Sequence, residues 1–152
     1  MSRGTSFGDE QFRGATDTST FQKGTVFAIM PFSGAFDDVY SAIKDECKKL
    51  HLTSTRVDET TGSGFILKKI FTCIEEAEFI VVDLTEERPN VYYELGYAHG
   101  VGNEENDILL IAQTGTKLHF DIASLSVQFY SSTENLRNII QSHLKQMIRL
   151  TR

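Results

Sequence analysis

Cysteine is scarce in this sequence, and its scarcity argues against whole classes of protein. Only two cysteines occur, Cys47 and Cys73, and their spacing does not fit a metal site. Each falls within a helical pattern, which is typical of a buried thiol in a reducing compartment. We therefore expect no disulfide, no catalytic thiol and no metal site.

Long apolar segments are also missing. No stretch of the 152 residues approaches the ~20 apolar residues that a membrane-spanning helix needs. The N-terminus lacks the apolar run of a secretory signal peptide. The sequence therefore predicts a cytoplasmic protein that does not enter a membrane.

Basic charge is in short supply as well. The chain has 15 Lys and Arg against 21 Asp and Glu, a net charge of −6, and no dense basic cluster. Binding to duplex nucleic acid usually needs a basic face that displaces counterions from phosphates, so we do not expect it. A nucleotide-sized ligand stays compatible with this charge, because one or two cations and a helix N-terminus can hold it.

The length fits one domain preceded by a tail. Residues 1–23 are rich in Ser, Thr and Gly, contain Phe7, Phe12 and Phe21, and show no helical or strand period. This composition predicts a flexible N-terminal tail and a folded domain over residues 24–152. The alternative is an arm that packs its phenylalanines on a neighbouring subunit.

From residue 25 onward, apolar runs alternate with helical patterns. Strands are expected at residues 25–30, 52–58, 79–83, 108–112 and 127–130, with helices between them and a last helix from residue 133. Strands that alternate with helices require right-handed crossovers. The sequence therefore predicts an α/β fold, a flavodoxin-like or Rossmann-like, doubly wound sheet of five parallel strands.

In such sheets, ligands bind at the carboxyl ends of the strands, near the point where strand order reverses. This rule predicts that a ligand binds at the loops at residues 31–34, 58–64, 83–90 and 113–116, and at the loop after Tyr130. Asp83 and Arg56 stand at or near predicted strand ends, and bare backbone amides precede a helix at residues 62–64. The residues expected to bind substrate are Pro31, Phe32, Arg56, Asp58, Gly62, Ser63, Gly64, Asn90 and Tyr93.

Glu94 is the candidate catalytic residue. A helix is expected to start at Pro89-Asn90, with Asn90 as N-cap. Glu94 then lies at the border of the inward stripe, one turn from the positive end of the helix, where a carboxylate can stay ionised while half removed from water. The alternative is a Glu that only complements the helix dipole.

Several segments resemble the nucleoside 2-deoxyribosyltransferase-like superfamily, and more narrowly its small bacterial members called Toll/interleukin-1-receptor-like (TIR-like). The segments are residues 29–32 (IMPF), 56–59 (RVDE), 64–66 (GFI), 80–85 (IVVDLT), 89–99 (PNVYYELGYAH) and 119–122 (HFDI). The likeness covers about residues 26–130, and the segment 89–99 is its most specific part.

The resemblance implies a role for two carboxylates. In the deoxyribosyltransferases, the Glu of a Y-E-x-G-Y-A segment attacks the anomeric carbon, and Glu94 matches that position. Related TIR enzymes need a comparable helical Glu to split nicotinamide from NAD. The transferases commonly carry an acidic residue six positions earlier, where this sequence has Arg88. Asp83 is the nearest substitute and is our second candidate catalytic residue.

Three functions follow as alternatives. The first is an enzyme that cleaves the N-glycosidic bond of a nucleoside, a nucleotide or NAD, without a cofactor. The second is a module that binds a nucleotide without turnover. The third is a TIR-like oligomerising module, such as one used in antiphage defence. Relatives often complete one site with residues of a second subunit, and a small domain offers a shallow crevice, so we expect a homo-oligomer.

Overall fold

The computed structural model describes residues 21–31, 33–57, 63–119 and 125–152, with the side chains of residues 63–65 excepted. Residues 1–20 of the expected tail, which covered residues 1–23, lie outside the described residues, whereas residues 22 and 23 belong to the first strand. The elements are β1 (Gln22–Ile29), η1 (Gly34–Phe36), α2 (Asp37–Lys49), β2 (Thr53–Thr55), α3 (Ser63–Glu76), β3 (Ala77–Asp83), α4 (Pro89–Gly100), η2 (Glu105–Asp107), β4 (Ile108–Gln113), β5 (Val127–Tyr130) and α6 (Thr133–Thr151).

The strands form one parallel sheet in the order β2-β1-β3-β4-β5. β3 is central, and all of its residues are buried. Its Phe-Ile-Val-Val run suits this position, because a strand covered on both faces needs apolar side chains in both directions. The predicted flavodoxin-like architecture is confirmed.

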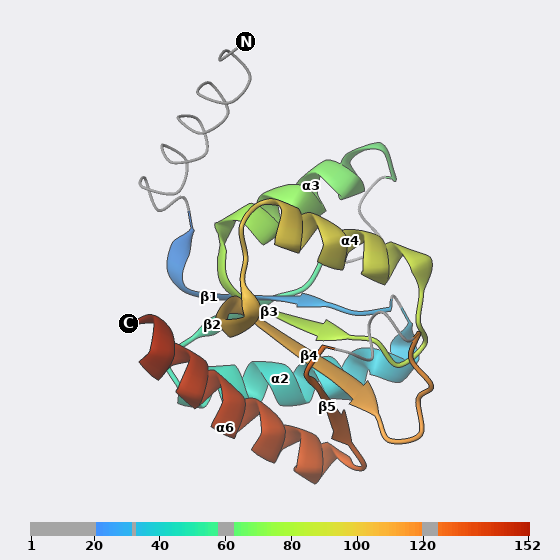
Figure 1. The fold of residues 1–152 in the computed structure, drawn as a ribbon, viewed down its shortest axis with the longest axis vertical. Coiled ribbons are helices and arrows are strands. Elements are labelled where there is room, and N and C mark those ends of the chain that lie inside the picture. The colour runs from blue at the N-terminus through green and yellow to red at the C-terminus, as the bar shows by residue number, and fades with distance from the viewer. Residues whose placement is uncertain (1–20, 32, 58–62, 120–124) are drawn as a thin grey trace.

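Helices cover both faces of the sheet (Figure 1). α2 and α6 pack on one face, where Ala42, Ile43, Ile140 and Leu144 are fully buried. α3 and α4 cover the other face with Ile70, Ile74, Leu95 and Ala98. α3 and α4 begin at the carboxyl ends of the strands, and α6 finishes at the amino ends.

Most helix and strand positions agree with the sequence expectations, and some differ. β5 and the start of α6 fall where expected, and Ser132 caps α6 by accepting a hydrogen bond from the Asn135 N–H. β2 is shorter than the expected strand and ends before Arg56. Leu67 belongs to the apolar sequence of α3 but is 42% exposed.

The expected N-cap of α4 was wrong. Arg88 is the N-cap residue and makes no side-chain cap hydrogen bond, whereas Asn90 lies inside the first turn of the helix. Pro89 explains the difference, because its fixed φ favours the first helical position and its missing N–H costs nothing there. The cap is therefore the residue before the proline.

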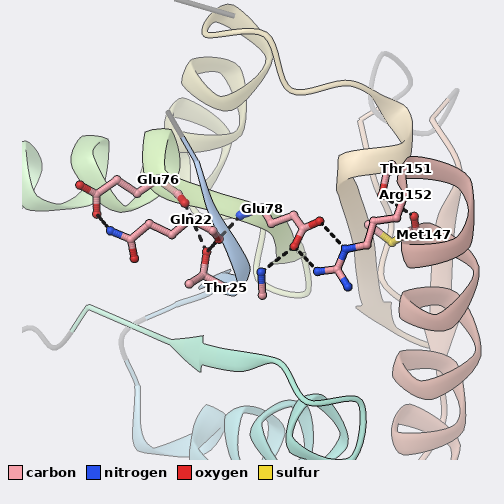
Figure 2. A network of polar contacts seen from close by, with 8 residues as sticks. Gln22, Thr25, Glu76, Glu78, Met147, Thr151 and Arg152 are labelled. Carbon is pink, nitrogen blue, oxygen red and sulfur yellow. Dashed lines mark hydrogen bonds and ion pairs between the residues drawn. The ribbon is translucent and has the colours of Figure 1, made fainter. Parts of the chain in front are cut away.

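A polar network ties the amino ends of the strands to the end of α6 (Figure 2). Glu78 in β3 is buried and accepts hydrogen bonds from the Gly24 N–H at 2.7 Å and from Arg152 at 2.5 and 3.0 Å. Thr25 donates to the backbone carbonyl of Glu76 at 3.2 Å. The contacts satisfy the buried carboxylate of Glu78, and they lie at the opposite end of the sheet from the loops nominated for ligand binding.

The packing of α6 gives a test of this core. Leu144→Ala removes a fully buried side chain and should lower the free energy of unfolding by about 2–5 kcal/mol. Leu150→Ala on the same helix removes a side chain that is 57% exposed and should change it by less than about 0.5 kcal/mol. Urea unfolding followed by circular dichroism measures both, and equal losses would contradict the described packing.

Candidate functional site at the carboxyl ends of β1 and β3

The order of the strands locates a candidate site. The chain leaves β1 for β2 on one side of it, and later strands are added on the other side, so strand order reverses between β1 and β3. Crevices at such a switch point, outside the carboxyl ends of the strands, are the usual ligand sites of these sheets. Here Pro31 follows β1, Asp83 ends β3, and Glu94 comes from α4, which begins at the same end.

Glu94 lies on the buried side of α4. Its side chain shares that side with Val91, Leu95 and Ala98, and the residue is only 6% exposed. Burial disfavours the charged form and raises the pKa of Glu94 to about 7, although a hydrogen bond from Asn90 acts in the opposite direction. Glu94 therefore exchanges its proton near neutral pH.

The other buried carboxylates have fuller sets of partners. Glu46 contacts Lys49 at 2.9 Å, Arg137 at 3.3 Å and Gln141 at 2.8 Å. Glu78 has the pairing with Arg152 described above. Within the described ranges no cation pairs with Glu94, and a buried carboxylate without a cation is costly to ionise. This contrast separates Glu94 from the structural acids of the fold.

Asp83 is fully buried at the end of β3. Its Oδ1 accepts hydrogen bonds from the Thr85 N–H at 2.9 Å and the Thr85 hydroxyl at 2.5 Å, and its Oδ2 accepts one from the Tyr130 hydroxyl at 2.6 Å. Burial raises the pKa of Asp83, and these hydrogen bonds lower it in part. Asp83 thus connects the carboxyl ends of β3 and β5 beneath the site.

Arg56 lies just past β2, at the same end of the sheet. Its guanidinium donates to Asp37 at 3.1 Å and stands 4.6 Å from the centre of the Tyr40 ring. These contacts fix the cation at the start of α2, with its side chain still 24% exposed. A cation held in this way can contact an anionic ligand group without reorganising its own side chain.

Two further predicted residues come from the first turns of α4. Asn90 is exposed and donates a hydrogen bond toward Glu94. Tyr93 is 59% exposed, and its ring centre lies 6.1 Å from that of Phe71 on α3. Tyr97 stacks on Phe71 at 4.1 Å, which gives it the packing role expected of a tyrosine on a helix face.

Part of the expected site falls where no description is possible. Phe32, Asp58 and Gly62 lie outside the described residues, and Ser63 and Gly64 are described only as the first residues of α3. In the parts of the chain that are described, no three His, Cys, Asp or Glu side chains gather as metal ligands would. No helix there is long and apolar enough to cross a membrane.

The structure also shows partners at this end of the sheet that the sequence analysis did not name. Thr85 and Tyr130 hold Asp83, and Glu87 holds Tyr92 and His119. The contact between Asp83 and Thr85 could have been predicted from the sequence, because an Asp side chain often accepts a hydrogen bond from the backbone N–H two residues later. The other contacts join residues far apart in the sequence.

A separate cavity of about 460 Å³ lies away from these residues. It is bounded by the start of β4 and the end of α6, including Ile108, Leu109, Met147 and Leu150. These positions belong to the amino ends of the strands, so the cavity is not part of the site around Glu94.

No family model matches the chain, and no curated protein matches it in sequence. Solved structures do match, and they place the chain in the flavodoxin-like class of α/β folds. A mutant flavo di-iron protein from Thermotoga maritima matches with a TM-score of 0.64 and 16% sequence identity over 88% of this chain. The chain spans only 38% of the length of that protein.

A second match comes from a protein of similar size. The CMP N-glycosidase BcmB of Clostridium botulinum matches with a TM-score of 0.57 and 14% sequence identity. The alignment covers 78% of this chain and 98% of that one. At these identities both likenesses establish the fold alone.

The pKa of Glu94 predicts how stability depends on pH. Below pH 4.5 the carboxyl is protonated in both states, whereas between 4.5 and about 7 it ionises in the unfolded chain only. The unfolded state then binds fewer protons, so stability present at low pH is lost as pH rises, by up to about 3 kcal/mol. Glu94→Gln should remove this loss, which urea unfolding at pH 5 and pH 8 would measure. Equal pH dependence in both proteins would contradict it.

Proposed function

We propose that the protein cleaves an N-glycosidic bond in a nucleoside, a nucleotide or NAD, with Glu94 as the carboxylate at the anomeric carbon. The observation that carries this proposal is the burial of Glu94 beside the β1/β3 switch point, without a cation among the described residues. Perturbed carboxyls in such a position are candidate functional groups.

The chemistry suits one buried carboxylate. As the bond between the anomeric carbon and the base nitrogen breaks, its electron pair leaves with the base, and positive charge develops on the sugar. Ionised Glu94 stabilises that charge or forms a bond to the carbon, and water then supplies the hydroxyl of the released sugar. The base gains a proton, and the water loses one.

The neighbouring residues have supporting roles in this proposal. Arg56 offers a cation to a phosphate, and Tyr93 offers an exposed ring to the base or ribose. As the second candidate catalytic residue, Asp83 would act by protonating the departing base. Its bonds to Thr85 and Tyr130 would have to open for direct proton transfer, so they favour a role in positioning the loop. The other predicted substrate-binding residues are Pro31, Phe32, Asp58, Gly62, Ser63, Gly64 and Asn90.

The likeness to a CMP N-glycosidase supports this reaction class and suggests nucleoside 5′-monophosphates for the first assays. The alignment covers 98% of that protein, so the likeness extends over nearly the whole of it. Deoxynucleosides and NAD belong in the same assays, because the sequence resemblance implies them as well.

Binding without turnover is the second candidate function. The strand order 2-1-3-4-5 supports it, because flavodoxin-like sheets with this order hold a mononucleotide at the β1/β3 switch point. A nucleotide that raises the melting temperature while no base is released would favour this function over cleavage.

We also propose that the protein is a homo-oligomer. Leu67 on α3 and Tyr93 on α4 are large exposed side chains on neighbouring helices next to the site, which supports a contact with a second copy. Light scattering at assay concentration should give at least the mass of a dimer, and a monomer under those conditions would contradict the proposal.

Glu94→Gln tests the catalytic role. It keeps the size of the side chain but removes the negative charge that is needed mainly in the transition state. Release of base, followed by chromatography, should fall by about a hundredfold or more, while substrate binding persists. Glu105→Gln removes an exposed acid far from the site and serves as the control. Full activity in Glu94→Gln would contradict the proposal.

The pH dependence of the rate separates the two protonation states. If Glu94 acts as a carboxylate, kcat/KM should rise with pH, about tenfold per unit, and level off above the pKa of about 7. A rate that instead falls with increasing pH through this range would mean that Glu94 works in its protonated form, as an acid.

A further inference from the structure

Glu87, in the loop between β3 and α4, joins two segments at the carboxyl end of the sheet. One oxygen, Oε1, accepts hydrogen bonds from the Tyr92 hydroxyl at 2.6 Å and from the His119 N–H at 3.2 Å. The same oxygen lies 2.7 Å from Nδ1 of His119. The side chain of Glu87 is 22% exposed, whereas that of His119 is 75% exposed, so the carboxylate is the inner member of the group.

The backbone of Glu87 is in the left-handed region, with φ +48°. Glycine adopts this conformation readily, but other residues do so with strain. Strain of this kind persists where surrounding contacts hold it, and it often occurs near functional sites. A glycine would satisfy the turn, so the side chain is the reason that a glutamate stands here.

The side-chain contacts of Glu87 hold the start of α4, which has no side-chain cap. The N-cap residue Arg88 makes no side-chain cap hydrogen bond, so no capping side chain holds the start of the helix. Tyr92 belongs to the first turn and lies between Asn90 and Glu94 in the sequence. Its hydroxyl bond to Glu87 ties the turn to the preceding loop.

His119 extends the tie to the chain that follows β4. The rings of Tyr92 and His119 meet edge to face with their centres 6.1 Å apart. The neighbouring Leu118 packs with Tyr92 against the core under α4. Glu87 therefore fastens the first turn of α4 to the segment before residue 120.

We propose that Glu87 is a positioning residue, which sets the first turns of α4, and with them Glu94, against the carboxyl ends of the strands. The kinetic consequence of this role rests on the proposed function, because it requires that Glu94 acts on a bound sugar. The structural consequence does not depend on that reaction and can be measured without a substrate.

Glu87→Gly is the most informative variant, because it relieves the backbone strain and removes the tie in one change. Hydrogen exchange in the first turn of α4 and in residues 117–119 should become about tenfold faster. Tyr92→Phe should give part of this effect. Trypsin should also cut faster after Lys117, a site outside the substituted loop.

Glu86→Gln is the matched control. Glu86 is the preceding residue, is exposed, and pairs only with Arg88 among the described residues. Its substitution removes the same charge near the same helix N-terminus, so a general dipole effect would appear equally in both variants. Exchange in Glu86→Gln should match the wild type.

The kinetic arm uses nucleoside 5′-monophosphates, deoxynucleosides and NAD as probes. With the substrate that the wild type cleaves, Glu87→Gly should lower kcat by about tenfold to a hundredfold and change KM by less than about threefold, because a misplaced Glu94 still permits binding. A merely stabilising role would lower the melting temperature and leave kcat unchanged under native conditions.

The outcomes separate the two proposals. If the wild type releases no base from any probe, the proposed function fails. The hydrogen-exchange rates of Glu87→Gly and the wild type then still decide whether Glu87 holds the first turn of α4. If Glu87→Gly leaves exchange and trypsin cleavage at wild-type rates, Glu87 holds nothing, and the positioning role is overturned even where cleavage activity exists.

Discussion

At the carboxyl end of the central strand, the carboxylate of Asp83 is sealed from solvent and bonded on both oxygens. These partners reduce the cost of burying the Asp83 carboxylate, and losing one of them would leave a buried polar atom unsatisfied. Tyr130 reaches Asp83 from β5, across β4, and the Thr85 hydroxyl also accepts from the Gln113 N–H at 3.0 Å. The ends of three strands and the first residues of the β3–α4 loop are thus fixed together.

This constraint acts on the loop that follows β3. Leu84 continues the sheet by donating to the Ile111 carbonyl at 2.9 Å, and the Glu87 N–H closes a turn on the Leu84 carbonyl at 3.0 Å. The chain then reaches Pro89, whose fixed φ starts α4. Because the loop is short and anchored at Asp83, the direction of α4 and the depth of Glu94 depend on that anchor.

Much of this could be predicted from the sequence. Buried β-branched runs such as that of β3, separated by helical patterns, are enough to predict a parallel sheet. In a parallel sheet all strands end at the same edge, and this places Asp83 and the start of the helix that carries Glu94 at one edge. The helical period places Glu94 next to Val91 and Ala98 at the edge of the inward stripe, which predicts half-burial. The structure buries Glu94 further, to 6% exposure, and this burial raises its pKa instead of leaving it readily ionised. The predictable features depend on local periodicity, which a single sequence records.

The remaining features depend on contacts between distant residues. Tyr130 meets Asp83 across 47 positions, and His119 meets Glu87 across 32. No local sequence pattern predicts such distant pairs. The left-handed backbone conformation of Glu87 could not be predicted either, because glutamate rarely adopts it. The error at Asn90 was of another kind, because the local preference of proline for the first helical position outweighed the preference of asparagine for the cap.

The two buried carboxylates of the candidate site differ in their hydrogen-bond partners. Asp83 and Glu94 are both buried, and burial raises the pKa of each. Asp83 has its oxygens occupied by Thr85 and Tyr130, and these hydrogen bonds offset part of the cost of burying its charge. Glu94 has the Asn90 amide as its donor among the described residues, and its charged form is left costly near neutral pH. In the proposed reaction, the positive charge that develops on the sugar would offset the cost of ionising the buried Glu94 carboxyl.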